Sequence, residues 1–367
     1  MAQNKTAHGK TRIGRRSFIA MGAAATAGIA QAQSISVKNR MRKNIPDPAE
    51  TVEPVSDAQF DAAVATLEST GMFDDEKRLP ALRVVQRAID RMAGTAEFMA
   101  GMRDATPKAQ IDAIHAKFPV MRWYDRAFDR VFDAFTSAKV TGPVPAVWYL
   151  YNMGVLVKTA TCAFGIDICH RQAPRLARHL DFLLATHNHG DHYNMNLVNA
   201  MCAAGKPVVT NFHLCRDWYS RELEKTFTIG DVTIHTTAAD HQPWLHLAVT
   251  CFEVVCGKGN DAFTIFHSGD CCRADHLKPR GRPDLYLGHC AIRLDILKAA
   301  QTTMPAKLIL PVHHQELGHI PGQYRCVAFE DEPLTTVRRL REAGFESAMP
   351  VWGDLLTKPN ICRANLP

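Results

Sequence analysis

The sequence predicts a mixed α/β (α+β) domain that is preceded by a small helical region. Apolar residues recur at helical spacing in residues 56–142, whereas short apolar runs rich in β-branched and aromatic residues follow from residue 143 onward. The 367 residues, of which 46% are hydrophobic and 22% charged, are enough for one large globular domain and a smaller one. We divide the chain into residues 1–32, 33–55, 56–142 and 143–367.

Residues 1–32 have the features of an export signal. They carry five basic residues and no acidic residue, and the pair Arg15-Arg16 precedes Phe18 and a short apolar run. The segment ends in an A-x-A cleavage pattern at residues 30–32 and resembles a twin-arginine signal. A basic tail with a chance arginine pair is the alternative. We therefore expect export to a bacterial periplasm, with residues 33–55 as a polar linker.

The charge of the chain indicates which partners it favours. The formal net charge of +6 falls to about +1 when the five cations of the leader are set aside. No run of Lys and Arg remains that would follow a phosphate backbone, so we expect no nucleic-acid partner. No other segment contains about 18 uninterrupted apolar residues, so we expect no transmembrane span in the mature chain.

Four helices are expected in residues 56–142, where they would form a helical cap on the domain that follows. The first begins at a capping box at Ser56. The second begins at Pro80, and the third begins at Thr106-Pro107. The apolar stripes expected to be buried are Phe60, Val64 and Leu67, then Leu82, Val85, Ile89 and Met92, then Ile111, Ile114 and Phe118, and finally Phe128, Val131, Phe132 and Phe135.

Residues 143–367 show the patterns of strands that alternate with helices around a sheet. One helix is expected at residues 194–205, closed by Gly205, and a hairpin is expected around Gly230-Asp231. The expected strands lie in residues 146–159, 163–168, 180–186, 206–211, 227–237, 247–257, 261–270 and 307–314.

Residues 186–192, THNHGDH, carry the clearest chemical signal. His187, His189, Asp191 and His192 directly follow an apolar strand. Three further candidates also follow apolar strands, namely His241, Asp270 and His313. Side chains at neighbouring strand ends converge, and imidazole and carboxylate are common metal ligands. Chance clustering among 17 histidines is the alternative, but seven candidates at strand ends favour a metal site.

These residues resemble the metallo-β-lactamase superfamily, over roughly residues 144–367. The resemblance implies a four-layer αβ/βα sandwich with a dinuclear site. It assigns His187, His189 and His241 to one metal, Asp191, His192 and His313 to the other, and Asp270 as the bridge. It also places Asp167 beneath the site as a structural aspartate. The donor types favour two divalent ions, first of all zinc, with manganese or iron as alternatives.

Several other residues near the motif have two readings. His235 and His246 lie close enough to His241 in sequence to replace it as a ligand. His314 is a candidate catalytic residue that would donate to substrate or to an oxyanion, with an exposed side chain as the alternative, and Asp191 is a candidate proton acceptor. We expect structural roles for His267, His289 and His319, with a position lining the cleft as the alternative. We expect packing roles for Cys271 and Cys272, with a position close to a metal as the alternative. The eleven cysteines show no pattern from which pairs could be assigned.

Within the superfamily, Asp270 in place of a cysteine points away from the zinc β-lactamases. The first hairpin is more similar to the branch with the ascorbate-phosphate lactonase and the N-acyl phosphatidylethanolamine phospholipase D, although Cys271 and His314 depart from that branch's pattern. The resemblance thus implies a hydrolase that uses a metal-bound hydroxide on a lactone, ester or related acyl bond of a small-molecule or lipid-derived substrate, and the leader segment implies that it is exported.

Three alternative functions remain. The same site could cleave a phosphodiester, or the protein could bind metal or ligand without turnover. An oxygen-reducing di-iron protein is disfavoured because no flavodoxin-like domain follows the site. The helical region is a lid for the site or a surface for a homo-oligomer.

Overall fold

The computed structural model describes residues 53–92, 108–212, 224–290, 294–314, 317 and 333–357. All of them belong to one compact unit, Val52–Pro367. The expected export signal, most of the linker, the Thr106-Pro107 cap and His319 lie outside the described residues. In the described part of the chain, no helix has both the length and the apolar character needed to cross a membrane.

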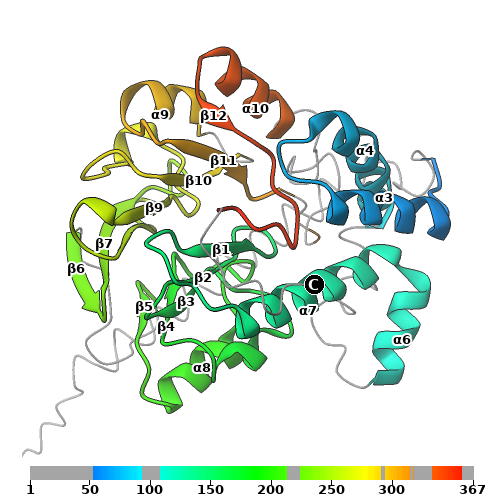
Figure 1. Cartoon of the computed structure of the whole chain (residues 1–367), viewed down its shortest axis with the longest axis horizontal. Helices are drawn as coiled ribbons and strands as arrows, with labels where there is room; N and C mark the ends of the chain where they lie inside the picture. Colours follow the sequence, from blue (N-terminus) through cyan, green and yellow to red (C-terminus); the bar gives the residue numbers. More distant parts are fainter. Residues whose placement is uncertain are drawn as a thin grey trace, which may run out of the picture. The chain divides into compact units, whose positions relative to one another are not determined.

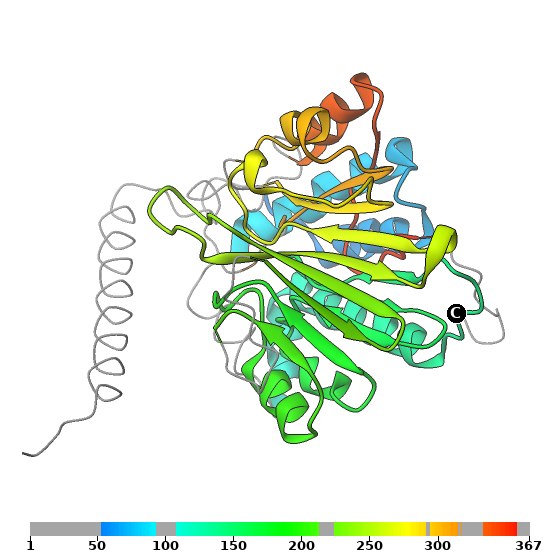
Figure 2. The same ribbon diagram turned by 90° about the vertical axis from the view of Figure 1, so that its left-hand side faces the viewer.

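Two β-sheets form the centre of this unit, and they lie face to face in Figure 2. The first is a five-stranded sheet in the order β1-β2-β3-β4-β5. Its strands are β1 (Ala146–Tyr149), β2 (Val155–Lys158), β3 (Ala163–Ile166), β4 (Phe182–Ala185) and β5 (Val208–Thr210). The first three strands pair antiparallel, and β4 and β5 extend the sheet in parallel with β3.

The second sheet has seven strands in the order β12-β11-β10-β9-β8-β7-β6. They are β6 (Glu224–Ile229), β7 (Val232–Ala239), β8 (Val249–Cys256), β9 (Phe263–His267), β10 (Leu285–His289), β11 (Leu308–Val312) and β12 (Glu346–Ser347). Strands β6 to β9 pair antiparallel, and β9 to β12 pair in parallel. Strands β7 and β9 are both antiparallel to β8, so β7, β9, β10 and β11 all end at the same edge.

Alternation along the strands produces a four-layer sandwich. In β4, Phe182 and Leu184 belong to the apolar cluster between the sheets, whereas Leu183 belongs to the cluster on the outer face. The outer clusters are completed by helices, with α8 (Met195–Ala203) on the first sheet and α9 (Ile296–Thr302) on the second. The α/β fold predicted from the sequence is therefore confirmed, including the layer order that the family resemblance implies (Figure 1).

The region before the sandwich is helical, as predicted, and consists of α3 (Asp57–Ser69), α4 (Asp75–Met92), α6 (Lys108–Lys117) and α7 (Pro119–Ser137). The capping box at Ser56 is present, with both reciprocal hydrogen bonds to Gln59. Helix α7 buries the predicted Phe128 and Phe135 against the outer face of the five-stranded sheet. The region therefore shares its core with the sandwich.

Two details of the helical prediction are wrong. Helix α4 does not begin at Pro80, because Asp75 and Glu76 start it more than one turn earlier and Pro80 lies inside it. Acidic residues in a first turn stabilise a helix start, and this explains the earlier beginning. Ile111 and Ile114 are only half-buried, because α6 packs mainly at its α7 end.

The sequence analysis missed β10, β12, α9 and α10 (Pro333–Glu342). Strand β10 has five buried residues, LYLGH, without alternation, and this is typical of a central strand covered on both faces. Its position between β9 and β11 matters for the site, because it ends in His289.

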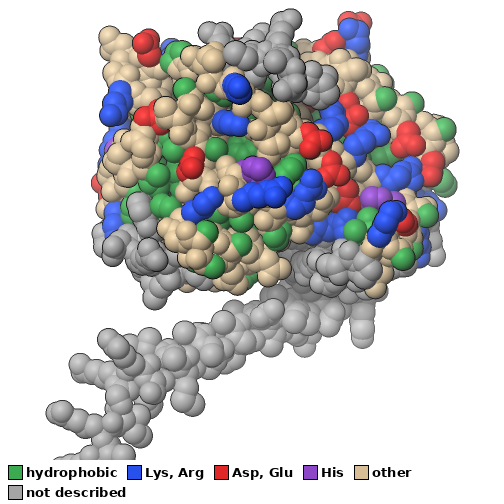
Figure 3. Space-filling model, turned by 60° about the horizontal axis from the view of Figure 1, so that its bottom comes forward, with side chains coloured by type: hydrophobic (Ala, Val, Ile, Leu, Met, Phe, Trp, Pro, Cys, Tyr) green, Lys and Arg blue, Asp and Glu red, His purple; other side chains and the backbone are tan. Residues whose placement is uncertain are grey.

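Charge is mixed on the surface of the unit. Figure 3 shows Lys and Arg side chains in a row on one face, with acidic side chains nearby. Among the described lysines, Lys158 and Lys206 donate to the backbone carbonyl oxygens of Phe135 and Leu180, at 2.8 and 2.6 Å. Part of the basic charge is thus used to hold the fold, and the absence of a nucleic-acid partner stays a prediction.

Candidate metal centre

The structure brings all seven predicted ligands to one edge of the sandwich. The loop after β4 supplies the four residues of the motif, and strand ends of the other sheet supply His241, Asp270 and His313. Among the described residues, three groups have potential ligand atoms within 4.8 Å of one another. These groups are His187, His189, His241 and Asp270, then Asp191, His192 and His313, and finally Asp270, His289 and His313.

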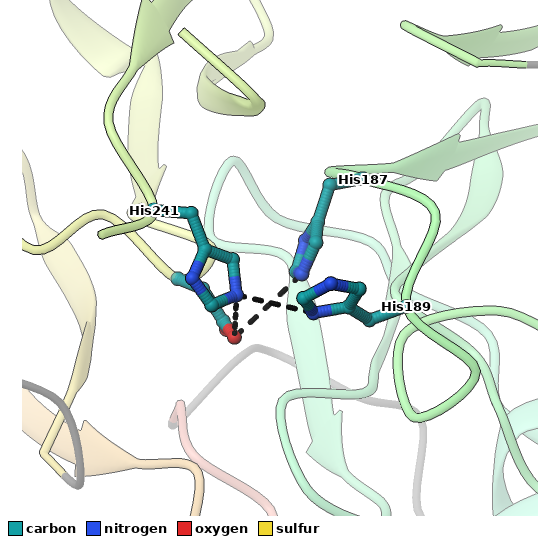
Figure 4. Close-up of side chains that lie close together, drawn as sticks. His187, His189 and His241 are labelled. Carbon is teal, nitrogen blue, oxygen red and sulfur yellow. Dashed lines mark hydrogen bonds and ion pairs between the residues drawn. The ribbon is translucent and has the colours of Figure 1, made fainter. Parts of the chain in front are cut away.

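The first group is formed by three imidazoles around one carboxylate oxygen (Figure 4). Oδ2 of Asp270 lies 3.1 Å from Nε2 of His241 and 3.6 Å from Nε2 of His187. His241 Nε2 is also 3.1 Å from Nδ1 of His189. His187 and His241 are buried and His189 is exposed, so this position is open to solvent on the His189 side.

The second group lies on the other oxygen of Asp270. Oδ1 of Asp270 is 3.0 Å from Nε2 of His192 and 3.6 Å from Nε2 of His313. Oδ2 of Asp191 is 3.2 Å from His313 Nε2 and 3.5 Å from His192 Nε2. Asp270 therefore faces both groups with one oxygen each, which is the arrangement of a bridging ligand.

These separations fit first-row divalent cations. Two ligands that bind one cation at about 2.1 Å and a tetrahedral angle are about 3.4 Å apart, and at a right angle about 3.0 Å apart. The contacts of 3.0 to 3.6 Å lie in this range. In addition, His187 Nε2, His192 Nε2 and Asp270 Oδ1 are buried and have no hydrogen-bond partner among the described residues. Buried polar atoms are normally satisfied, so these atoms have the chemistry of ligands that hold metal.

Asp167 orients the ligands from below, as the family resemblance implies. Its Oδ1 accepts the backbone N–H of Thr186, and its Oδ2 accepts the Thr186 hydroxyl, both at 2.8 Å. The same Oδ2 is 2.8 Å from Nδ1 of His192. Because Nδ1 of His192 is engaged there, Nε2 is left to face the second group. Such carboxylate–histidine pairs fix the ring and the tautomer of a ligand.

The backbone around the site is held in uncommon conformations. Asp167, Asn152 and His313 have φ values of 51°, 61° and 65°, which L-residues with a side chain rarely adopt. Each costs on the order of 1–2 kcal/mol and persists only where its surroundings enforce it. Gly269, with φ of 50°, precedes Asp270, and a Cβ there would lie 2.8 Å from Cβ of Thr186. Glycine is thus required where the two sheets approach each other.

Burial and mutual charge shift the pKa values of these groups. Burial lowers the pKa of His187 well below its usual range and keeps its ring neutral. Burial also acts to lower the pKa of His192, but the carboxylates of Asp270, Asp191 and Asp167 outweigh it and raise that pKa well above the usual range. Asp270 shows the reverse balance, with burial opposed by His192 and other imidazoles, and its pKa lies well below the usual range. The carboxylates and imidazoles of the site therefore stabilise one another's charged forms.

His289, for which a structural role was predicted, lies in the third ligand group with Asp270 and His313. Its ring is fully buried and stacks on that of His313 at 3.9 Å, and its Nε2 lies 3.4 Å from Asp270 Oδ1. The signal was available, because the apolar run LYL before it follows the pattern of the other strand ends.

The remaining histidines are separated from the two main groups. His235 contacts Thr226 at 2.9 Å on the hairpin, and His246 is 72% exposed, so His241 is the residue that joins His187 and His189. His267 is fully buried, with Nε2 donating to Met153 O at 3.0 Å and Nδ1 accepting from Gly269 N. Both nitrogens of that ring serve the fold.

The two candidate catalytic residues differ in their surroundings. The side chain of Asp191 is 25% exposed, and Nδ2 of Asn152 donates to its Oδ2 at 3.1 Å. His314 is buried, pairs with Asn152 in a β-bridge, and lies 5.7 Å from the ring of Tyr149. It belongs to none of the three groups, and its catalytic role stays a prediction.

No described cysteine belongs to the metal groups. Cys271 is buried, its Sγ donates to Arg273 O at 3.1 Å, and Cys272 is half-buried. Both are free thiols, and Cys202 is disulfide-bonded.

The fold and the site define a two-sheet α/β sandwich with two candidate histidine–aspartate metal positions at one edge. No family model matches the chain, and no curated protein matches it. Among solved structures, it is similar to a metallo hydrolase from the archaeon Ignicoccus hospitalis, with 13% identity and a TM-score of 0.45 over 59% of this chain and 98% of that chain. The metallo-β-lactamase fold protein YhfI from Bacillus subtilis has 16% identity and a TM-score of 0.40 over 59% of this chain and 96% of that chain.

A protein with different chemistry is also similar. CmlA, a diiron β-hydroxylase from Streptomyces venezuelae, has 11% identity and a TM-score of 0.41 over 73% of this chain and 62% of that chain. At such scores we transfer no activity from any of these proteins.

Proposed function

We propose that the protein is a dinuclear metal-dependent hydrolase that acts on a lactone, ester or related acyl bond. One observation carries this proposal: Asp270 faces two ligand groups, one with each oxygen, and each group contains at least two further imidazoles. A shared carboxylate of this kind is suited to two cations about 3.5–4 Å apart. Zinc is the first choice for these donors, with manganese or iron as alternatives.

Bound divalent cations would supply Lewis acidity toward the substrate's oxygen and would lower the pKa of coordinated water. The chain itself contributes the orientation of its ligands. Asp167 and Thr186 hold the rings of His192 and His187 by their Nδ1 atoms, at 2.8 and 3.0 Å, so that both Nε2 atoms face Asp270. Asp270 itself is buried and so is shielded from bulk solvent.

The two ligand carboxylates then have different tasks. Asp270, with a side chain 5% exposed, is suited to permanent ligation, whereas Asp191, at 25%, is the one within reach of solvent and substrate. Asn152 fixes Asp191 by donating to both its side chain and its backbone oxygen. We therefore assign Asp191 as the group that takes a proton during hydrolysis, and His314 as the residue to test for a role in substrate binding.

Export by the twin-arginine route is part of the proposal. The features of residues 1–32 support it, and the disulfide at Cys202 is compatible with an oxidising compartment.

The test begins with metal content. Purified residues 33–367 would be analysed by elemental mass spectrometry, and then assayed against a panel of lactones, carboxylic esters and phosphodiesters. We expect two metals per chain and turnover confined to the acyl substrates. Turnover of phosphodiesters alone would replace the proposed bond class. Two metals without any turnover would support a metal-binding protein, and fewer than two would contradict the dinuclear site.

A further inference from the structure

Exposed apolar side chains are concentrated in the segments that directly follow two candidate metal ligands. Among the described residues, six large hydrophobic side chains are exposed. Three of them follow the ligand His241 within six positions, namely Trp244, Leu245 and Leu247, which are 68, 36 and 47% exposed. A fourth, Met195, is three positions after the ligand His192. We call these four residues the apolar rim. Scattered exposed apolar residues are ordinary, but such a concentration indicates a binding surface.

The loop that carries most of the rim is fixed in place. His241 N donates to Leu245 O at 3.1 Å, and Leu245 N donates to Gln242 O at 2.9 Å, which closes a tight turn. Leu247 has φ of 50°, and its N–H donates to Oδ1 of the buried Asp240 at 2.9 Å. A positive φ is uncommon for leucine and raises the energy of the backbone, so the surrounding contacts must hold Leu247 in this conformation.

Contacts between loops connect the rim to both ligand segments. Nε2 of His241 and Nδ1 of His189 are 3.1 Å apart at the open side of the first metal position. Asn211 donates to Ala248 O at 3.0 Å, and the ring of its neighbour Phe212 lies 4.7 Å from that of Tyr193. The loop that carries Trp244, Leu245 and Leu247 is therefore joined to the ligand His241 at the side where His189 is exposed, and through Asn211 and Phe212 to Tyr193, near Met195.

The chemistry of the loop points to a neutral, apolar ligand. Residues 242–248, QPWLHLA, contain no Lys, Arg, Asp or Glu. An anionic membrane surface is normally bound through clusters of Lys and Arg, and none is present in this loop. We propose that the apolar rim binds the acyl chain of the substrate, so that the protein selects esters or lactones with long apolar chains. This inference rests on the proposed hydrolase function.

The test measures chain-length dependence with and without turnover. Metal-loaded protein would be titrated calorimetrically with butanoate, hexanoate and decanoate, which share one carboxylate and differ only in the chain. Full burial of a methylene is worth about fourfold in affinity, and partial burial on a rim should still give roughly tenfold or more between butanoate and decanoate. The variant Trp244→Ser with Leu247→Asn should abolish this gain, since asparagine tolerates the left-handed backbone. Phe73→Ser, which removes an exposed apolar residue in the helical region, is the matched control.

The same comparison is then made for kcat/KM on butanoyl and decanoyl esters and lactones. Chain-length-dependent binding without hydrolysis would remove the proposed function and leave the rim assignment standing. Hydrolysis with equal kcat/KM and equal binding for both chains would overturn the rim assignment alone. Cosedimentation with phosphatidylcholine vesicles that requires Trp244, together with no dependence on chain length, would assign the rim to a lipid surface and also overturn the proposal.

Discussion

Replacing Asp270 with asparagine should empty both metal positions at once. Oδ1 of Asp270 lies 3.0 Å from His192 Nε2, and Oδ2 lies 3.1 Å from His241 Nε2. The substitution keeps the size of the side chain but replaces the charge and one oxygen. Loss of even an indirect partner of a metal ligand costs 10- to 100-fold in affinity. We therefore expect a loss of at least about 100-fold at each position.

The consequence for stability follows by mass action. A 100-fold weaker affinity removes about 2.7 kcal/mol of metal-dependent stabilisation when free metal is well above the dissociation constant. In a unit of about 300 residues, 1 kcal/mol corresponds to roughly 1.5–2 °C in Tm. The rise in Tm that zinc produces should thus shrink by about 4–5 °C for each position in Asp270→Asn. Scanning calorimetry with and without zinc, beside elemental mass spectrometry, measures both effects.

Asp240→Asn is the matched control for this experiment. Asp240 is also a buried carboxylate at a strand end, adjacent to His241, but it lies outside the three ligand groups of the described residues. It should keep two metals and the full zinc-dependent rise in Tm. If Asp270→Asn behaves like this control, the bridging assignment is refuted.

Three further predictions concern the surroundings of the site. Gly269→Ala places a Cβ 2.8 Å from Thr186 at a positive φ, so the free energy of unfolding measured in urea should fall by about 2–4 kcal/mol. Gly190→Ala is the control, because no atom lies within 4 Å of its Cβ, and it should change that free energy by less than about 0.5 kcal/mol. Equal effects of the two substitutions would contradict the close approach of the sheets. Burial lowers the pKa of His170 to about 3 from 6.5, so its contribution to stability is complete above pH 6.5 and falls as the pH drops toward 3. At pH 4.5 the loss is about 2.7 kcal/mol of unfolding free energy. Metal-free His170→Gln should lack this part of the acid sensitivity, and an unchanged dependence of stability on pH would argue against a neutral buried ring. His289→Asn should reduce the metal content from two toward one, measured by elemental analysis and by the visible spectrum of the cobalt form, while two retained metals would assign His289 to packing.

The sequence predicted that the seven candidate ligands lie together because their signal is local. Each candidate follows an apolar run of strand length, and parallel strands end at a common edge whatever the loops between them do. His241 and His313 are 72 positions apart in the chain, yet both follow strands of the seven-stranded sheet, β7 and β11, that end at the same edge. The choice of His241 over His235 followed from the family position, and the structure shows why: His235 lies within β7 and faces the hairpin partner Thr226.

The parts that the sequence did not predict depend on tertiary contacts. His289 was assigned a structural role because β10, a buried run without alternation, was not recognised as a strand, although the apolar residues LYL precede His289 as apolar runs precede the other candidates. The start of α4 was misplaced because Pro80 was taken as a first-turn residue. The buried ion pair of Arg78 with Asp354, at 2.8 Å, joins that first turn to a loop 276 residues away, and no local pattern reveals it.

The candidate metal ligands come from both halves of the sandwich, and this has a consequence for the order of folding. His187, His189, Asp191 and His192 belong to the sheet that is synthesised first, whereas the partners that complete either position are His241, Asp270 and His313 on the sheet that follows. Neither of the two main groups is complete in one half, although Asp270, His289 and His313 all follow strands of the second sheet. A cation in either main group would therefore be fully ligated only after the halves have docked. Metal capture would then be among the last steps of maturation, and the time at which the chain gains its metals would report when its two sheets come together.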